Sequence, residues 1–239
     1  MIMEVPFVAC FPNFLVQRYA LKKFRFHVGG TVTAAKFALD HGWGINIGGG
    51  FHHCSSNNGG GFCPYADITI ALEFLFLKGL IQKAMILDLD AHQGNGHERD
   101  FTGDQRVYIM DVYNAYIYPG DDRAKRGISR EVVVNHSTSD KSYMEKLAGN
   151  LNSALNEFDA DILLYNAGTD CLQGDPLGNM RLSPECIVER DEFVFSECKR
   201  RNIPIVMVTS GGYQRNNARI IADSILNLWR KDLIQKPNL

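Results

Sequence analysis

The stretch Ala84-Met-Ile-Leu-Asp88-Leu-Asp90-Ala-His92 joins a short apolar run to polar side chains at alternate positions. A brief, continuous apolar run is typical of a strand that is buried on both faces, as strands are in a parallel sheet. Where such a strand unwinds into its loop, residues i and i+2 can face the same side. The stretch therefore predicts a buried strand at Ala84–Asp88 that presents Asp90 and His92 at its carboxyl end.

Segments of two kinds alternate along the rest of the chain. Short apolar runs predict strands, and longer runs with apolar residues every three or four positions predict helices. This alternation favours a three-layer α/β fold, with helices on both faces of a parallel sheet, in a single domain over residues 1–239. The other strands are predicted at Trp43–Ile47, Val107–Met110, Val132–Val134, Ile162–Tyr165 and Ile205–Val208. The helices are predicted at Thr31–His41, Tyr65–Leu77, Lys141–Phe158, from Ser183 to Arg200, and from about Asn216 to Trp229.

Polar residues follow five of these strands. In open parallel sheets, ligands bind beyond the carboxyl ends of the strands, which all lie at the same edge. The sequence therefore predicts a single site at that edge. Its candidate members are His52 and His53, Asp90 and His92, Asp111, Asp170, and Tyr213.

Asp90, His92 and Asp170 have the chemistry of a metal site. Two carboxylates and one imidazole suit zinc, and they leave a position open for water and substrate. An isolated Asp-x-His pair is more often a loop that caps a helix, but Asp170 and the histidine pair favour the metal. A two-metal centre, as in manganese ureohydrolases, is the main alternative. It would need further carboxylate or histidine ligands, and the strand ends offer too few.

His52, His53 and Tyr213 are the candidate catalytic groups. Adjacent histidines after Gly48-Gly49-Gly50 can carry out acid–base chemistry beside a metal, whereas an isolated pair is more often structural. The glycine run does not match a phosphate-binding loop, because neither Gly-x-Gly-x-x-Gly with a helix nor a Lys-Ser/Thr ending is present. Tyr213, after a buried strand, can donate a hydrogen bond to an oxyanion. Taken alone, it would be equally well explained as a packed tyrosine.

Composition narrows the class of protein. The formal net charge of −2 and the absence of a basic block argue against direct nucleic-acid binding. No apolar run reaches membrane length, and Val5–Val16 lacks a basic leader, so we expect a nuclear or cytoplasmic protein. The six cysteines form no paired framework and are expected to be reduced, buried thiols.

Four motifs resemble those of the histone deacetylase family. They are Gly48-Gly-Gly-Phe-His52-His53 with Gly61-Phe62-Cys63, Asp88-Leu-Asp90-Ala-His92-Gln-Gly-Asn95, Gly168-Thr-Asp170 with Gly174-Asp175-Pro176, and Gly211-Gly212-Tyr213. The resemblance extends from Gly29 to Leu228. The segments His52-His-Cys-Ser-Ser56 and Arg219–Asn227 are most similar to class IV. An arginase/deacetylase-like fold is implied.

The resemblance also implies residue roles. Asp90, His92 and Asp170 would hold Zn²⁺, His53 would act as general base and acid, and His52 would be an electrostatic partner oriented by Asp88. Tyr213 would polarise the amide carbonyl. The implied substrate tunnel comprises Gly61, Phe62, Tyr118, Gly211 and Gly212. A structural K⁺ is implied at Asp88, Asp90, His92, Asp111 and Val112, held mainly through backbone oxygens.

The implied activity is zinc-dependent hydrolysis of Nε-acyl-lysine amides in proteins such as histones or cytosolic enzymes. Class IV resemblance further implies a preference for long-chain fatty acyl groups, and complexes with other deacetylases or corepressors. Asn95 departs from class I relatives, which have an aspartate there, and a lower pKa of His53 is expected.

The sequence also leaves other functions open. The family's catalytic domain has further elements before the segment that matches Ala9–Gly29 of this chain. The chain is expected to lack them, which would leave apolar surface uncovered. A catalytically weak scaffold that binds partners through that surface is therefore one alternative. An acyl-polyamine amidohydrolase is a second.

Overall fold

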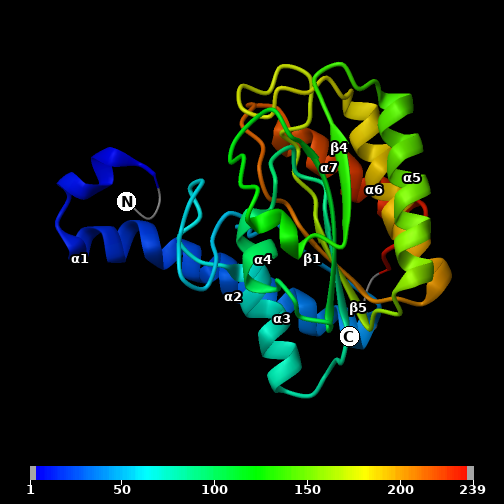
Figure 1. Ribbon diagram of the computed structural model, residues 1–239, viewed down its shortest axis with the longest axis horizontal. Coiled ribbons are helices and arrows are strands. Elements are labelled where there is room, and N and C mark those ends of the chain that lie inside the picture. The colour runs from blue at the N-terminus through cyan, green and yellow to red at the C-terminus, as the bar shows by residue number, and fades with distance from the viewer. Residues whose placement is uncertain (1–3, 236–239) are drawn as a thin grey trace.

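The computed structural model describes residues 4–235, and its centre is one six-stranded sheet in which every strand pair is parallel (Figure 1). The strand order across the sheet is β1-β6-β5-β2-β3-β4. The central strands are therefore β5 and β2, whose ends carry Asp170 and Asp90. The strands are β1 (Trp43–Asn46), β2 (Ala84–Asp88), β3 (Val107–Asn114), β4 (Arg130–Val134), β5 (Ile162–Asn166) and β6 (Ile205–Val208).

Helices cover both faces of the sheet, which confirms the predicted three-layer fold (Figure 1). On one face, α2 (Lys22–His41) and α3 (Asp67–Leu77) pack against strand residues such as Ile86. On the other, α5 (Asp140–Glu157), α6 (Pro184–Arg201) and α7 (Asn217–Arg230) pack against residues such as Leu87. Because successive side chains of a strand point to opposite faces, both of which are covered, β2 is wholly buried and its first four residues, 84–87, are apolar.

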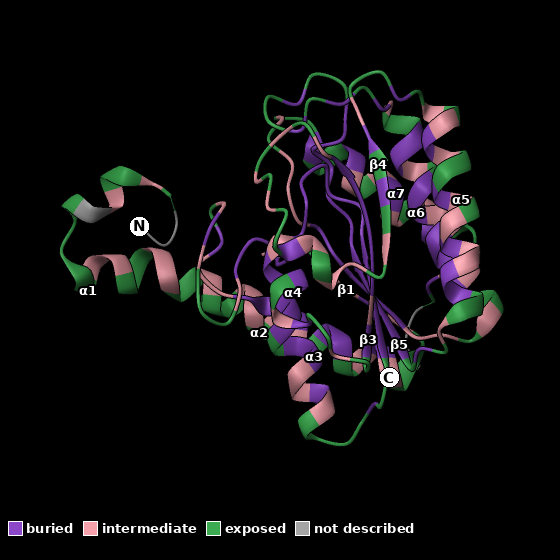
Figure 2. Cartoon of the chain, viewed as in Figure 1, coloured by how far each residue is buried: buried purple, intermediate pink, exposed green. Residues whose placement is uncertain are grey.

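Short segments complete the described chain. They are a 3₁₀ segment Pro6–Cys10, α1 (Asn13–Leu15), a π segment Val16–Leu21, α4 (Asn95–Asp100) and a 3₁₀ turn Ala124–Gly127. The part that precedes α2 projects away from the sheet and is largely exposed (Figure 2). Among residues 4–235, no helix is long and apolar enough to cross a membrane.

Helix starts follow local capping chemistry. Ser139 and Ser183 precede α5 and α6, and each side chain accepts a hydrogen bond from the backbone N–H three residues on. Such caps satisfy one of the free N–H groups of a first turn. Pro184 occupies the first position of α6, where its missing N–H costs nothing. These signals explain why both helices begin within one residue of their predicted starts.

Two predicted boundaries were wrong in ways that matter. The first long helix begins at Lys22 rather than Thr31, because Gly29 and Gly30 do not interrupt it. Gly30 is needed there, since a Cβ would lie 2.7 Å from the Asn46 side chain. The strand that starts at Val107 continues to Asn114, because its second half pairs with β4. Asp111 therefore lies within the sheet, directly opposite Asp88 of β2.

Candidate active site

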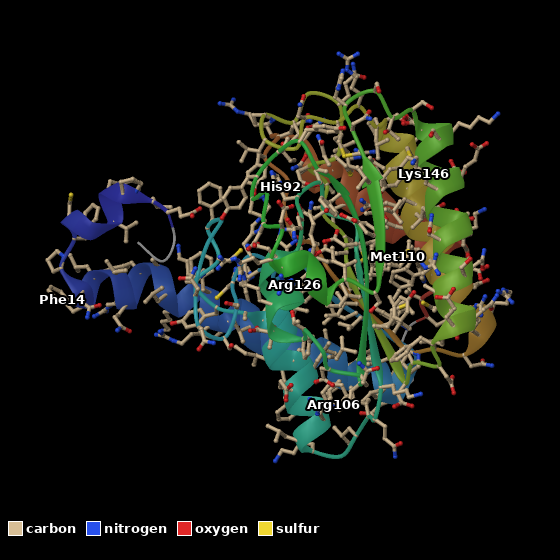
Figure 3. The ribbon with its side chains drawn as sticks, in the orientation of Figure 1. Phe14, His92, Arg106, Met110, Arg126 and Lys146 are labelled. Atoms are coloured by element: carbon tan, nitrogen blue, oxygen red, sulfur yellow. The ribbon has the colours of Figure 1, made fainter. Side chains whose placement is uncertain are left out.

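Asp90, His92 and Asp170 meet at the carboxyl end of the sheet, as the strand order requires. His92 lies among the loops at that end, whereas Met110 lies within the sheet (Figure 3). The Nδ1 atom of His92 is 2.8 Å from Asp170 Oδ2 and 3.1 Å from Asp90 Oδ1. One donor atom from each of the three lies within 4.8 Å of the others, and all three residues are buried. The predicted ligand set is thus assembled around one point.

Backbone groups hold the two carboxylates in place. The N–H of Ala91 donates to Asp170 Oδ1 at 2.8 Å, which links the ends of β2 and β5. The N–H of Gly211 and the hydroxyl of Ser210 both donate to Asp90 Oδ2 at 2.9 Å. Gly211, predicted as a tunnel residue, therefore lies against the candidate metal ligands and is not among the residues that line the pocket.

The electrostatics of this group suit a cation. Burial alone would lower the pKa of His92, but its hydrogen bonds to Asp170 and Asp90 raise that pKa to about 10. Burial and the neighbouring Asp90 raise the pKa of Asp170 to about 7. A proton on His92 thus balances two close carboxylates, and a divalent ion bound to the same three side chains would supply that positive charge instead. The donor set therefore fits a metal ion.

The two adjacent histidines lie in different environments. His52 Nδ1 is 2.9 Å from Asp88 Oδ2. Burial opposes the charged form of His52, but Asp88 and Asp90 outweigh it and raise its pKa to about 9. His53 Nδ1 is 2.9 Å from Asn95 Oδ1, and burial together with His52 holds the pKa of His53 well below its usual range. His52 is therefore the cationic member of the pair and His53 the neutral one.

Asn95 also fixes the tautomer of His53. Its Nδ2 donates to Asp121 at 3.1 Å, so its oxygen faces the histidine. His53 must then donate through Nδ1, which leaves a lone pair on Nε2. The expected lowering of the His53 pKa agrees with this geometry, because an amide oxygen stabilises an imidazolium less than a carboxylate does.

His97 is a site residue that the sequence analysis overlooked. Its Nε2 lies 2.8 Å from Asp88 Oδ2, the same oxygen that His52 contacts. A second buried group of potential metal ligands is therefore formed by His52, Asp88 and His97. The sequence analysis had found too few ligands at the strand ends for a two-metal centre. The signal was hard to recognise because His97 comes from α4, which was not predicted.

Tyr213 lines one pocket together with three of the five predicted tunnel residues, Gly61, Phe62 and Tyr118. The pocket is formed by Glu4, His53, Gly61, Phe62, His92, Tyr118, Leu177 and Tyr213. The rings of Phe62 and Tyr213 are 6.3 Å apart, and Tyr118 lies edge-on to His53 at 4.9 Å. Gly61 is required close to the base, because a Cβ there would overlap the His53 ring. Glu4 and Leu177 were not predicted.

The ionisation of Tyr213 suits a hydrogen-bond donor. Burial and then the carboxylates Asp90 and Asp170 raise its pKa far above the usual value. The phenol consequently keeps its proton at neutral pH. Gly212, another predicted tunnel residue, precedes Tyr213 in the same loop. It has no room for a side chain, because a Cβ there would overlap the side chains of Thr169 and Asn217.

A buried acidic group lies next to Asp88. Burial and then Asp88 raise the pKa of Asp111 well above its usual value, and burial raises that of Glu98. One oxygen of each, Asp111 Oδ1 and Glu98 Oε1, has no hydrogen-bond partner among the described residues. Asp111 and Glu98 therefore place two unpartnered carboxyl oxygens beside the Asp88 carboxylate.

The cysteines near the site have raised pKa values, which disfavours a nucleophilic role. Burial raises the pKa of Cys54 to about 11, and burial also raises that of Cys171. A thiol that keeps its proton is a poor nucleophile. Cys54, Cys63, Cys171, Cys186 and Cys198 are buried and unpaired, and Cys10 is exposed.

Comparison with known proteins agrees with this arrangement. Arabidopsis thaliana Histone deacetylase 2 is 55% identical over 234 residues, which cover 98% of this chain and 60% of that protein. The acetylpolyamine aminohydrolase of Burkholderia pseudomallei has the same fold, with a TM-score of 0.70 at 22% identity over 84% of this chain and 60% of that one. A histone deacetylase homologue complexed with SAHA gives 0.73 at 23% identity over 87% and 56%.

These matches identify the family, but they cover only part of the length of each relative. The chain spans about 60% of the length of the Arabidopsis relative. Residues 7–229 match the family described as the histone deacetylase domain, and together with the identity to the Arabidopsis protein this shows that the chain belongs to the histone deacetylase family.

Proposed function

We propose that the chain is a zinc-dependent hydrolase of Nε-acyl-lysine amides in proteins. The observation that carries the proposal is the convergence of three metal-type ligands, a cationic–neutral histidine pair and a protonated tyrosine around one pocket. The histidine pair and the tyrosine have the ionisation that amide hydrolysis requires of them.

Zinc is the proposed metal. Two carboxylates and one imidazole match a catalytic zinc site, which keeps a position open. Asp90, His92 and Asp170 would hold the ion, which supplies Lewis-acid activation of water and of the amide carbonyl.

The chain's own residues supply the proton transfers. His53 is neutral and has a free Nε2, so it accepts a proton from the attacking water and returns it to the leaving lysine amine. His52 stays charged on Asp88 and stabilises the developing negative charge. Tyr213 donates its phenolic hydrogen to the oxygen of the tetrahedral species.

Aromatic side chains at the mouth would hold the substrate's aliphatic stem. Phe62 and Tyr118 line the pocket, and both remain partly exposed. Class IV character and a preference for long-chain fatty acyl groups are proposed from the sequence resemblance. K⁺ is proposed at Asp88, Asp90, His92, Asp111 and Val112, supported by the orphaned oxygen of Asp111.

Substrates and location are proposals too. Acyl-lysine proteins such as histones or cytosolic enzymes are the proposed substrates, in the nucleus and the cytoplasm. Other deacetylases or corepressors are the proposed partners.

An acyl-polyamine is a second candidate substrate, favoured by one observation. The carboxylate of Glu4 lies at the pocket and accepts a hydrogen bond from the N–H of Gly61 at 3.1 Å. A carboxylate at the mouth would attract the ammonium groups of a polyamine.

The test is mass-spectrometric hydrolysis by the zinc-loaded chain of three substrates: an acetyl-lysine peptide, a myristoyl-lysine peptide and an N-acetylated polyamine. We expect free lysine peptide from the wild type and none from His92→Ala, with strongly reduced release by Tyr213→Phe. Tyr116→Phe, at a tyrosine that is 79% exposed, is the matched control and should hydrolyse at the wild-type rate. Turnover of the polyamine alone would favour the second candidate. No turnover by a folded, zinc-bearing chain would overturn both and favour a partner-binding scaffold.

A further inference from the structure

We infer that Asp175 is a positioning residue that fixes the backbone of the catalytic tyrosine relative to the loop that carries the third metal ligand. The inference rests on the proposed function, in which Tyr213 stabilises the oxyanion. It assigns to Asp175 the task of keeping the phenol over the metal ligands, although its own carboxylate takes no part in the chemistry.

Asp175 connects two loops that leave different strands. It lies five residues after Asp170, in the loop that follows β5, whereas Tyr213 lies in the loop that follows β6. The backbone N–H of Tyr213 donates to Asp175 Oδ2 at 2.8 Å. The other oxygen, Oδ1, accepts from Leu177 at 2.9 Å and from Gly178 at 3.1 Å. With 7% of its surface exposed, the carboxylate makes three hydrogen bonds in a nearly dry place.

The Oδ1 side of Asp175 is anchored to the metal loop. Gly178 packs so tightly on Asp170 that a Cβ would overlap the Asp170 carbonyl. Leu177, held by the same oxygen, lines the substrate pocket beside Tyr213. One carboxylate thereby sets the spacing between a ligand loop, a pocket wall and the tyrosine.

The tyrosine loop needs such a restraint. Ser210 has φ 49° and Gly212 has φ 155°, so the backbone turns twice just before Tyr213. Thr169 holds Gly211, whose carbonyl accepts from the Thr169 N–H at 2.7 Å. On the side of α7, the buried side chain of Asn217 adds no hydrogen bond to the loop, because both of its amide atoms lack a partner among the described residues. The bond from Tyr213 to Asp175 therefore holds the loop where its glycines would otherwise let it shift.

Asp175→Asn tests this role with little change of volume. The amide oxygen can still accept from Leu177 and Gly178, but its NH₂ group would then face the N–H of Tyr213, which is also a donor. A displacement of about 1 Å in a catalytic group costs about 100-fold in rate. We expect kcat to fall about 10- to 100-fold, whereas KM changes less than about threefold because Leu177 stays in place.

A double-mutant cycle separates positioning from general damage. If Asp175 acts through the phenol, adding Asp175→Asn to Tyr213→Phe should lower kcat by less than about threefold. Equal losses in both backgrounds would overturn the inference. Glu189→Gln, the same carboxylate-to-amide change on the exposed face of α6, is the control and should leave kcat unchanged.

A second readout does not depend on activity. Amide hydrogen exchange of the peptide at residues 209–215 should be faster in Asp175→Asn than in wild type, whereas exchange of β6 stays the same. Unchanged exchange at residues 209–215 would refute the restraint. If Asp175→Asn does not fold, Asp175→Ser is measured instead, because its hydroxyl oxygen can still accept in the turn but cannot reach Tyr213. Exchange at residues 209–215 should again be faster than in wild type. A wild type without turnover would refute the proposed function, and the exchange measurement would still decide the role of Asp175.

Discussion

The guanidinium group of Arg190 donates from Nη1 to the carbonyl oxygen of Gly168 at 2.8 Å, beneath the loop that carries Asp170. The same nitrogen lies 3.3 Å from the carbonyl oxygen of Leu89, which immediately precedes Asp90. Arg190 belongs to α6 and is fully buried. One side chain therefore ties together the two strand ends that supply the metal carboxylates.

Replacing Arg190 by Met should destabilise the fold and loosen the metal site. The change removes the Nη1 hydrogen bonds to two carbonyl groups and the cation that Nε places 3.0 Å from Asp191. Loss of one partner of a buried ion pair costs about 3–5 kcal/mol. Urea denaturation should show that loss in the free energy of unfolding, together with weaker zinc binding. Arg200→Met, at an exposed pair with Glu197, should leave the denaturation midpoint unchanged. Equal effects of the two changes would contradict the prediction.

Replacing Gly168 by Ala should damage the metal site directly. A Cβ on Gly168 would overlap the carboxylate of Asp90 and lie 2.7 Å from its Cα, so the ligand must move. We expect zinc affinity, measured by competition with a chelator, to fall at least about tenfold, the usual consequence of displacing groups that orient a ligand. Gly149→Ala is the control: it is exposed on α5, its Cβ would meet nothing within 4 Å, and it should stabilise the helix by about 0.5–1 kcal/mol. Normal zinc affinity in Gly168→Ala would refute this account.

The central strands and the catalytic edge could be predicted from sequence because they depend on local patterns. The four residues 84–87 are all apolar, which favours a strand that is covered on both faces. Once the strands are parallel, their carboxyl ends share one edge, and Asp90, His92 and Asp170 follow. These patterns also favoured acid–base chemistry for the histidine pair and hydrogen-bond donation by Tyr213, and the family resemblance then singled out His53 as the general base.

Other features of the site could not be predicted because they depend on contacts between residues that are distant in sequence. From the sequence alone, Asp111 is expected in the loop after a strand. Pairing with β4 extends β3 past this residue, so that Asp111 lies in the sheet beside Asp88. His97 lies on a helix of only six residues, too short to show an apolar period. Arg190 is a charged residue within an amphipathic helix, where exposure is the usual expectation. Only the packed fold shows that it faces the core.

Replacing Asn95 by Asp should shift the pH dependence of activity. The pKa of His53 is held low by burial and by His52, and a carboxylate at position 95 would favour the imidazolium and raise that pKa. A general base works in its neutral form, so the acidic limb of kcat/KM should move to higher pH. The new carboxylate would face Asp121, so the comparison is made in a chain that carries Asp121→Asn. The pH profile of Asp121→Asn alone is compared with that of Asp121→Asn combined with Asn95→Asp. A limb that moves to lower pH, or does not move, would exclude His53 as the base.

Metal binding should release protons, and metal affinity should rise with pH. In the metal-free site the pKa of His92 is raised to about 10, and that of Asp170 to about 7. Near pH 7, His92 is therefore protonated and Asp170 is protonated in about half of the molecules, and zinc must displace both protons. Below pH 7 the count should approach two, and between pH 7 and 10 it should approach one as Asp170 ionises.

Calorimetric titration of zinc into the metal-free chain, repeated in buffers with different ionisation enthalpies, measures the number of protons released. We expect between one and two near pH 7, and an apparent affinity that rises about tenfold per pH unit above pH 7, where one proton is released for each ion bound. His136→Gln, a change at an exposed histidine outside the described ligand groups, should leave the count unchanged. Release of no protons would show that His92 is already neutral between its two carboxylates, and would remove the charge balance on which the fit of this site to a metal ion partly rests.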